Sequence, residues 1–92
     1  MQLPATATLD EAAALAAGLP AVVAGGTGVL RVDASALQAF DSATIALLLQ
    51  ARRLAMEAGR GFEVAGTPAK LVELARLYGV DGLLQLVPAD GA

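Results

Sequence analysis

The chain has 92 residues, the size of one domain with a single hydrophobic core. It contains no cysteine and no histidine, which excludes disulfides, thiolate nucleophiles, imidazole bases and the metal sites that depend on these side chains. A net charge of −3 with only six basic residues argues against binding to nucleic acid or anionic lipid. We therefore expect neither a metal nor a cofactor.

The hydrophobic content is high, but it does not predict a membrane span. Hydrophobic residues make up 57% of the chain and aromatic residues only 3%, so we expect an aliphatic core. No apolar run reaches the roughly 18 residues that a spanning helix needs, because Pro20 and a group of glycines interrupt the one candidate. The first residues also lack the basic and apolar regions of a secretion signal. We expect a cytoplasmic protein that does not itself insert into a membrane.

The amino-terminal part predicts a strand followed by a helix. Residues Leu3–Leu9 are compatible with a short edge strand. Asp10 can cap a helix over residues 11–17, because its carboxylate can accept hydrogen bonds from the first free amides. Gly18 and Pro20 are expected to end that helix.

The middle of the chain predicts two strands with a long helix between them. Val29–Val32 is rich in β-branched residues and is expected to form a central strand. Strong helix formers then predict a helix that begins at Asp41 or Ser42 and continues to Ala58. Phe62–Ala65 follows as a second strand.

The carboxyl-terminal part predicts a second clear helix and a short strand. Thr67 is expected to cap this helix, with Pro68 at its first position and Gly79 as its left-handed terminator. Leu83–Val87 is compatible with a last strand, and residues 88–92 are expected to form a frayed tail. Residues at helical spacing predict one buried stripe on the helix: Leu71, Leu74, Ala75 and Tyr78.

Alternation of strands and helices predicts an α/β fold. We expect a mixed sheet with the helices packed mainly on one face, and one domain over residues 1–92.

The long helix has a wider apolar arc than one core contact requires. At about 100° per residue, one face collects the residues expected to pack on the sheet: Thr44, Leu47, Leu48, Ala51, Leu54, Ala55 and Ala58. An adjoining sector collects a second set, which we interpret as a partner-binding surface together with Asp41: Ser42, Ile45, Leu49, Arg52 and Met56. The alternative is that Ile45 and Leu49 belong to the core, in a helix that is buried more deeply than usual.

The polar residues near this helix favour structural roles over catalysis. Asp41 or Ser42 can serve as the N-cap, while Ser42 is also a possible phosphate acceptor at a positive helix end. Asp33 and Ser35 predict an Asx-type turn. Asp33 and Asp41 could in principle act as paired carboxylates, but no basic or nucleophilic partner for such chemistry accompanies them, so we predict no catalytic residues. The glycine-rich stretch at residues 25–28 precedes a strand and predicts a flexible turn, not a phosphate-binding loop.

Several motifs resemble the STAS family, whose members include the anti-sigma-factor antagonists. Asp33-Ala34-Ser35 after a strand and Asp41-Ser42 before a long helix are similar to that family over about residues 29–80. Ile45–Leu49 and Leu74–Val80 look like the leucine-rich helix and the Leu-Ala-(Lys/Arg)-Leu-Tyr signature of one subgroup, the cytoplasmic B subunits of Mla (maintenance of lipid asymmetry) ABC transporters.

The resemblance implies a STAS fold and a non-catalytic accessory subunit. Such a subunit binds the nucleotide-binding subunit of a phospholipid-transport ABC transporter, supports its assembly or activity, and is peripheral at the inner membrane through that complex. The position that matters in the transporter subunit matches Ser42.

A second interpretation is an anti-sigma-factor antagonist that binds a serine kinase and is modified at Ser42 or Thr44. In that group the phosphorylated serine follows Asp-Ser, where this chain has Ala43. A third interpretation is a stand-alone sensory or chemotaxis STAS domain.

Overall fold

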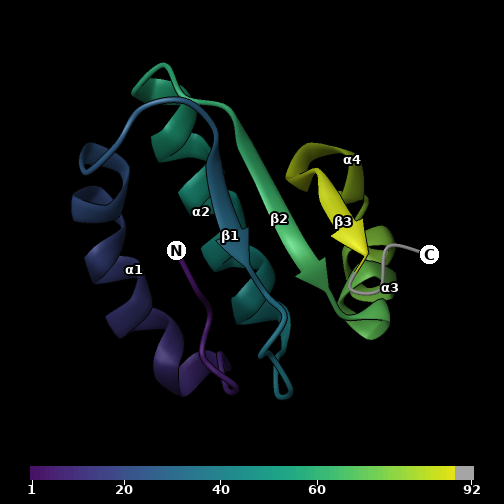
Figure 1. Cartoon of the computed structure of the whole chain (residues 1–92). Helices are drawn as coiled ribbons and strands as arrows, with labels where there is room; N and C mark the ends of the chain where they lie inside the picture. The colour runs from purple at the N-terminus through teal and green to yellow at the C-terminus, as the bar shows by residue number, and fades with distance from the viewer. Residues whose placement is uncertain (89–92) are drawn as a thin grey trace.

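A computed structural model describes residues 1–88, which form a three-stranded sheet and four helices (Figure 1). The elements follow in the order α1 (Leu9–Ala24), β1 (Leu30–Asp33), α2 (Ser42–Glu57), β2 (Phe62–Thr67), α3 (Ala69–Leu77), α4 (Asp81–Leu84) and β3 (Leu86–Pro88). This alternation confirms the predicted α/β class. No helix within residues 1–88 has the length and hydrophobicity needed to cross a bilayer.

The strands lie in the order β1-β2-β3, so β2 is the central strand of the sheet. Both pairs are parallel, with Val32 opposite Val64 and Val64 opposite Leu86. The prediction of a mixed sheet is therefore wrong for the described strands. The prediction that Val29–Val32 forms a central strand is also wrong, because the corresponding β1 has a regular strand partner only in β2.

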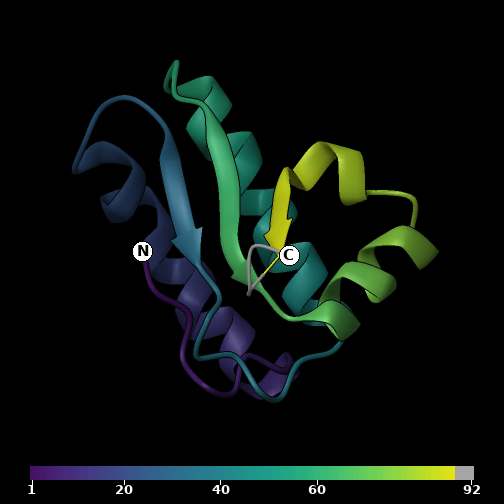
Figure 2. The same ribbon diagram turned by 45° about the vertical axis from the view of Figure 1, so that its right-hand side comes forward.

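The helices cover mainly one face of the sheet, as predicted. Figures 1 and 2 show α1 and α2 side by side behind the sheet, with α3 and α4 next to β3. Side chains alternate along β1, where Leu30 and Val32 are buried and Arg31 is exposed. On the uncovered face Arg31 forms an ion pair with Glu63 of β2 at 2.8 Å. The core is aliphatic apart from Phe62.

The segment before α1 runs beside β1 without forming a regular strand. Gln2 and Thr6 make isolated parallel bridges to the end of β1 and to the loop that follows it. Pro4 lies between the bridges and has no amide hydrogen for a continuous ladder. The predicted strand over Leu3–Leu9 is therefore wrong as a regular element, although Leu3 is fully buried.

Helix α1 begins two residues earlier than predicted. Thr8 is the N-cap, and both its amide and its hydroxyl donate to Oε1 of Glu11, at 3.0 and 2.6 Å. This is a capping box, and it leaves Asp10 in the first turn of the helix. The prediction of Asp10 as the cap is wrong because the Thr-x-x-Glu pattern starts the helix earlier.

Helix α1 also continues through both residues that were expected to end it. Gly18 and Pro20 lie inside the helix, while Leu19 and Val23 are buried in the core. Burial of these two side chains outweighs the low helix propensity of glycine and proline, because most helix stability in proteins comes from packing. The helix therefore ends at Ala24 and not near residue 17.

Arg60, in the turn before β2, holds the end of α1 in place. Its Nη1 donates to the carbonyl of Val23 at 2.8 Å and its Nε to the carbonyl of Gly28 at 3.0 Å. The guanidinium thereby satisfies a carbonyl in the last turn of the helix, where a cation is favoured. The turn at residues 25–28 is exposed, and Arg60 ties its last residue to the rest of the domain.

The long helix and the second strand match their predicted positions closely. Helix α2 spans Ser42–Glu57 with Asp41 as N-cap, and β2 extends two residues beyond the predicted end. Of the face predicted to pack on the sheet, five residues are buried: Thr44, Leu47, Leu48, Ala51 and Ala55.

The prediction for helix α3 is wrong at its beginning and correct at its end. Thr67 is not the cap: its hydroxyl is buried and donates to the carbonyl of Val64 at 3.2 Å, and Pro68 is the N-cap. The end is as predicted, because Gly79 has a φ of +72°. The amides of Gly79 and Val80 return to carbonyls in the last turn of the helix, which is a Schellman motif.

The predicted buried stripe of α3 is correct only in its first part. Leu71 and Ala75 are fully buried and Leu74 is half-buried, but Tyr78 is 52% exposed. Tyr78 is the C-cap, where the chain leaves the helix axis. Its side chain therefore lies at the surface.

The last predicted strand is part helix and part strand. Leu84 ends α4, Gln85 takes a left-handed conformation with φ 54°, and β3 follows over Leu86–Pro88. The predicted strand over Leu83–Val87 is wrong in its first half. Pro88 belongs to β3, and the rest of the predicted tail lies outside the described residues.

Candidate functional site

Asp41 joins the beginnings of two helices. Its Oδ1 accepts from the amide of Ala43 at 2.9 Å, which caps α2. Its Oδ2 accepts from the amide of Leu9 at 3.2 Å, the first residue of α1. The carboxylate of Asp41 thus stabilises the fold, and any contact that it makes with a partner is added to this role.

Thr44 completes the same junction from inside the core. Its side chain is fully buried, and its hydroxyl donates to the carbonyl of Ala7 at 2.6 Å. The same oxygen accepts from the amide of Asp41 at 3.1 Å. The hydroxyl of Thr44 is therefore closed to a kinase while the domain is folded.

Ser42 lies on the opposite side of this junction and is exposed. It is the first residue of α2, since the N-cap position belongs to Asp41. Among residues 1–88 its hydroxyl makes no hydrogen bond. Of the two hydroxyls predicted as possible phosphate acceptors, only that of Ser42 is accessible.

A shallow apolar groove runs from Ser42 along α2. It has a volume of about 300 Å³ and lies between α2 and the end of α3. Six residues line it, and we call it the α2 groove: Ser42, Ile45, Ala46, Leu49, Tyr78 and Val80. Two of the predicted surface residues differ in burial. Ile45 is only 4% exposed, whereas Leu49 is half-buried. Ile45 therefore belongs mainly to the core, as the alternative interpretation held, and forms the floor of the groove.

A second depression lies farther along the same side of α2. It has a volume of about 480 Å³, and we call it the arginine cleft. Its lining comes from α2, from the residue before β1, from the start of β2 and the turn before it, and from α4 and its C-cap: Val29, Arg52, Met56, Arg60, Gly61, Phe62, Glu63, Gly82, Leu83 and Gln85. Met56 is 54% exposed and Arg52 is half-buried. The sector predicted from the sequence is thus divided between the α2 groove and the arginine cleft.

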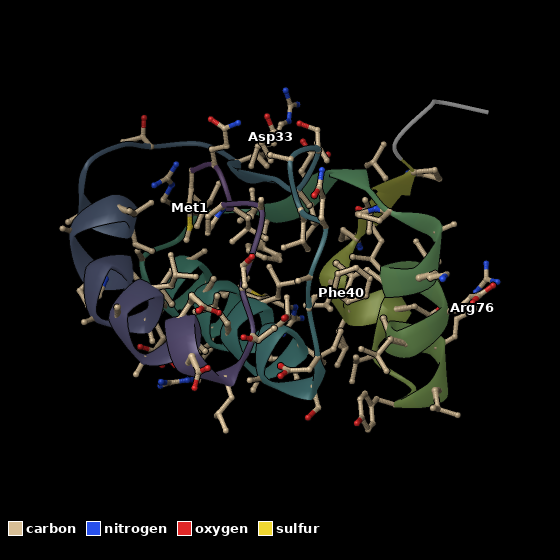
Figure 3. All side chains as sticks on the ribbon, turned by 90° about the horizontal axis from the view of Figure 1, so that it is seen from below. Met1, Asp33, Phe40 and Arg76 are labelled. Carbon is tan, nitrogen blue, oxygen red and sulfur yellow. The ribbon has the colours of Figure 1, made fainter. Side chains whose placement is uncertain are left out.

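Three residues of the α2 groove were not part of the surface predicted from the sequence. Tyr78 was assigned to a buried stripe, and Ala46 and Val80 entered only through the family motifs. Helical spacing places Tyr78 with Leu71, Leu74 and Ala75, and this spacing carries no signal that the last of the four is exposed. Figure 3 shows helix α3 at the edge of the molecule. Arg76 points away from this helix, and Phe40 points toward its side.

Asp33 and Ser35 form the predicted Asx-type turn after β1. The amide of Ser35 donates to Oδ1 of Asp33 at 2.9 Å. Ser35, through its hydroxyl and then through this amide, lowers the pKa of Asp33, because both groups favour the charged carboxylate. The predicted role in ordering the loop is confirmed. Within residues 1–88 no group of three acidic side chains is arranged to hold a metal ion.

Comparison with known proteins agrees with this geometry. The family model described as "Mlab, STAS domain" matches residues 1–88. The search of curated proteins gave no significant match. STAS domains generally mediate protein–protein interactions and are generally non-catalytic. Because the match extends well beyond residues 29–80, where the resemblance was first found, the chain belongs to the MlaB-type STAS domain family.

Proposed function

We propose that this protein is a non-catalytic accessory subunit of an Mla-type phospholipid-transport ABC transporter. It binds the nucleotide-binding subunit and supports the assembly or activity of the complex. The protein then works in the cytoplasm and reaches the inner membrane only through the transporter. It needs no cofactor, since its function is to hold a protein surface in place.

The observation that carries this proposal is the exposed Ser42 at one end of an apolar groove. Leu49, Tyr78 and Val80 present apolar surface beside it, and Tyr78 keeps half of its surface in water in the free domain. A tyrosine at the edge of an apolar groove is a common anchor in protein interfaces, because its ring is large and loses little entropy on binding. The family signature at Leu74–Val80 and the Asp41-Ser42 motif meet at this groove.

The anti-sigma-factor-antagonist interpretation has less support. Its phosphoacceptor position is occupied by Ala43, and the hydroxyl of Thr44 is buried and bonded on both sides. Only Ser42 remains available for phosphate. A phosphate there would add roughly two negative charges at the rim of the α2 groove and would weaken the docking of an apolar segment.

A binding experiment with one variant tests the proposal. Leu49→Asp places a charge in the α2 groove, and we expect it to raise the Kd for the purified ATPase subunit of the source organism's transporter at least about tenfold. Isothermal titration calorimetry measures this change. The matched control is Leu9→Asp, which makes the same substitution at an exposed leucine that does not line the α2 groove.

Thermal unfolding of both variants distinguishes docking from core packing. We expect Leu49→Asp to remain folded at the binding temperature, because the side chain is only half-buried. Wild-type affinity in a folded Leu49→Asp variant contradicts the proposed docking site. No binding by the wild-type protein contradicts the proposed function as a whole.

A further inference from the structure

Arg52 differs from the other four arginines in its surroundings. Among residues 1–88 it makes no ion pair and no hydrogen bond through its side chain. The others all contact acidic side chains or backbone carbonyls: Arg31 with Glu63, Arg53 with Glu57, Arg76 with Asp81, and Arg60 with the carbonyls of Val23 and Gly28. A guanidinium carries five donors, so Arg52 has its full binding capacity unused within the described chain.

The position of Arg52 makes this capacity relevant to docking. It is half-buried in the third turn of α2 and lines the arginine cleft beside Met56. Leu49, three residues earlier, lies on the same side of the helix and lines the α2 groove. A cationic site therefore follows an apolar site about 5 Å farther along the helix axis.

The remaining charges of the arginine cleft do not oppose an anion at Arg52. Glu63 is the only carboxylate among the described residues that line the cleft, and it is already paired with Arg31 at 2.8 Å. Arg60 adds a second positive charge to the lining. The cleft thus favours an acidic group over a basic one.

We propose that the partner places an aspartate or glutamate side chain on Arg52, next to an apolar side chain that fills the α2 groove. The occupant is one segment of the partner protein that carries both groups. Arginine suits this role because its planar guanidinium can bind a carboxylate through two parallel hydrogen bonds. This inference rests on the proposed function, since it describes the partner segment that the same surface takes.

Charge reversal at neighbouring arginines tests the inference. We expect Arg52→Glu to raise the Kd for the purified ATPase subunit at least about tenfold, because two carboxylates would then face each other. The matched control is Arg53→Glu, with the same charge change one position later, in a residue that forms an ion pair with Glu57 of the same helix. We expect the control to change the Kd by less than about threefold.

Salt dependence and reciprocal charge exchange identify the acidic side chain of the partner that binds Arg52. Arg52→Gln is expected to reduce the loss of affinity between low and high salt, because one ion pair is removed. Exchange of the partner's acidic residues for arginine, one at a time, is expected to find one that restores binding to Arg52→Glu.

The outcomes separate this inference from the proposed function. If Arg52→Glu binds like the wild type, or if Arg53→Glu is weakened equally, the inference is overturned. It is also overturned if no acidic residue of the partner restores binding. Loss of binding in Leu49→Asp would still support the docking site in each of these cases. If Leu49→Asp also binds normally, the proposed docking site fails with the inference, whereas the proposed function fails only if the wild-type protein does not bind the ATPase subunit.

Discussion

The carboxyl edge of the sheet and the side of α2 use their polar groups in opposite ways. At the carboxyl edge, Ser35, Asp41, Thr44 and Gly66 lie in tight contacts between loops and helix ends. Along α2, the hydroxyl of Ser42 and the guanidinium of Arg52 have no hydrogen-bond partner within the described chain. Groups of the first kind are needed for folding, whereas groups of the second kind are available to another molecule.

Two hydroxyls illustrate the difference within a single helix turn. Thr44 is fully buried and makes two hydrogen bonds, while Ser42, two residues earlier, is exposed and makes none within residues 1–88. Successive helix positions point in different directions, so one short motif serves both the fold and the surface. Substitutions in the two regions are therefore expected to affect different measurements.

The largest effect on stability is expected for Gly66→Ala at the carboxyl edge. Gly66 has a φ of +65°, and an added Cβ would lie 2.9 Å from Cβ of Ser35. Left-handed backbone costs roughly 1–2 kcal/mol for alanine and overpacking roughly 1–3 kcal/mol more, so we expect a loss of about 3 kcal/mol. Urea unfolding measures the loss. Gly79→Ala is the matched control, because its φ of +72° is similar but its added Cβ meets nothing within 4 Å. Equal losses would contradict the steric argument.

A smaller loss is expected for Thr44→Val, which keeps the shape of the side chain. It removes the hydroxyl that donates to Ala7 and accepts from Asp41, and leaves both backbone groups without a partner in the core. We expect a loss of about 2 kcal/mol in the free energy of unfolding. Ser42→Ala should change stability by less than about 0.5 kcal/mol, because its hydroxyl is exposed. Similar losses of unfolding free energy for Thr44→Val and Ser42→Ala would contradict the distinction between the carboxyl edge and the side of α2.

Two arginines, Arg60 and Arg52, are expected to differ in the same way in their contribution to stability. Arg60→Ala removes the hydrogen bonds to the carbonyls of Val23 and Gly28, and we expect a loss of about 1 kcal/mol, because the site is partly open to water. Arg52→Ala should change stability by less than about 0.5 kcal/mol. Thermal unfolding of the two variants checks this order. A larger loss for Arg52→Ala would show that its side chain stabilises the fold itself.

The sequence predicted best those elements in which local pattern and packing agree. Helix α2 has strong helix formers, an N-cap at Asp41 and a continuous buried face, and its bounds were predicted to within a residue. Gly79 was identified as the terminator of α3 because a left-handed residue at a helix end is a local requirement.

Predictions failed where distant contacts outweigh local preference. Gly18 and Pro20 do not end α1, because Leu19 between them and Val23 beyond them are buried. Thr67 does not cap α3, because its hydroxyl is inside the core. These outcomes depend on which elements pack together, and one sequence does not carry that information locally.

The candidate site was predicted in its α2 half and missed in its other half. Periodicity places Ser42, Leu49 and Met56 on one side of the helix, whatever lies opposite. Tyr78 and Val80 reach the same groove only through the turn after α3 and its packing beside α2. The depth of Ile45 likewise depends on that packing, so periodicity alone did not separate surface from core.

The smallest expected effect is a change in acid stability at the carboxyl edge. Ser35 holds the pKa of Asp33 below its usual 3.8 in the folded protein. The charged carboxylate therefore contributes stability that is fully present above about pH 4 and is lost as the pH falls through the folded-state pKa.

Asp33→Asn removes this titration while keeping an oxygen that can accept from the Ser35 amide. Urea unfolding from pH 6 to pH 2 is expected to show a constant difference between wild type and variant at the upper end, which shrinks at the lower end. Ser35→Ala should produce an intermediate profile, since the hydroxyl is the larger of the two influences on the Asp33 pKa and the amide bond remains. Parallel profiles for wild type and Asp33→Asn would mean that this turn orders the loop through geometry alone, without a contribution from charge.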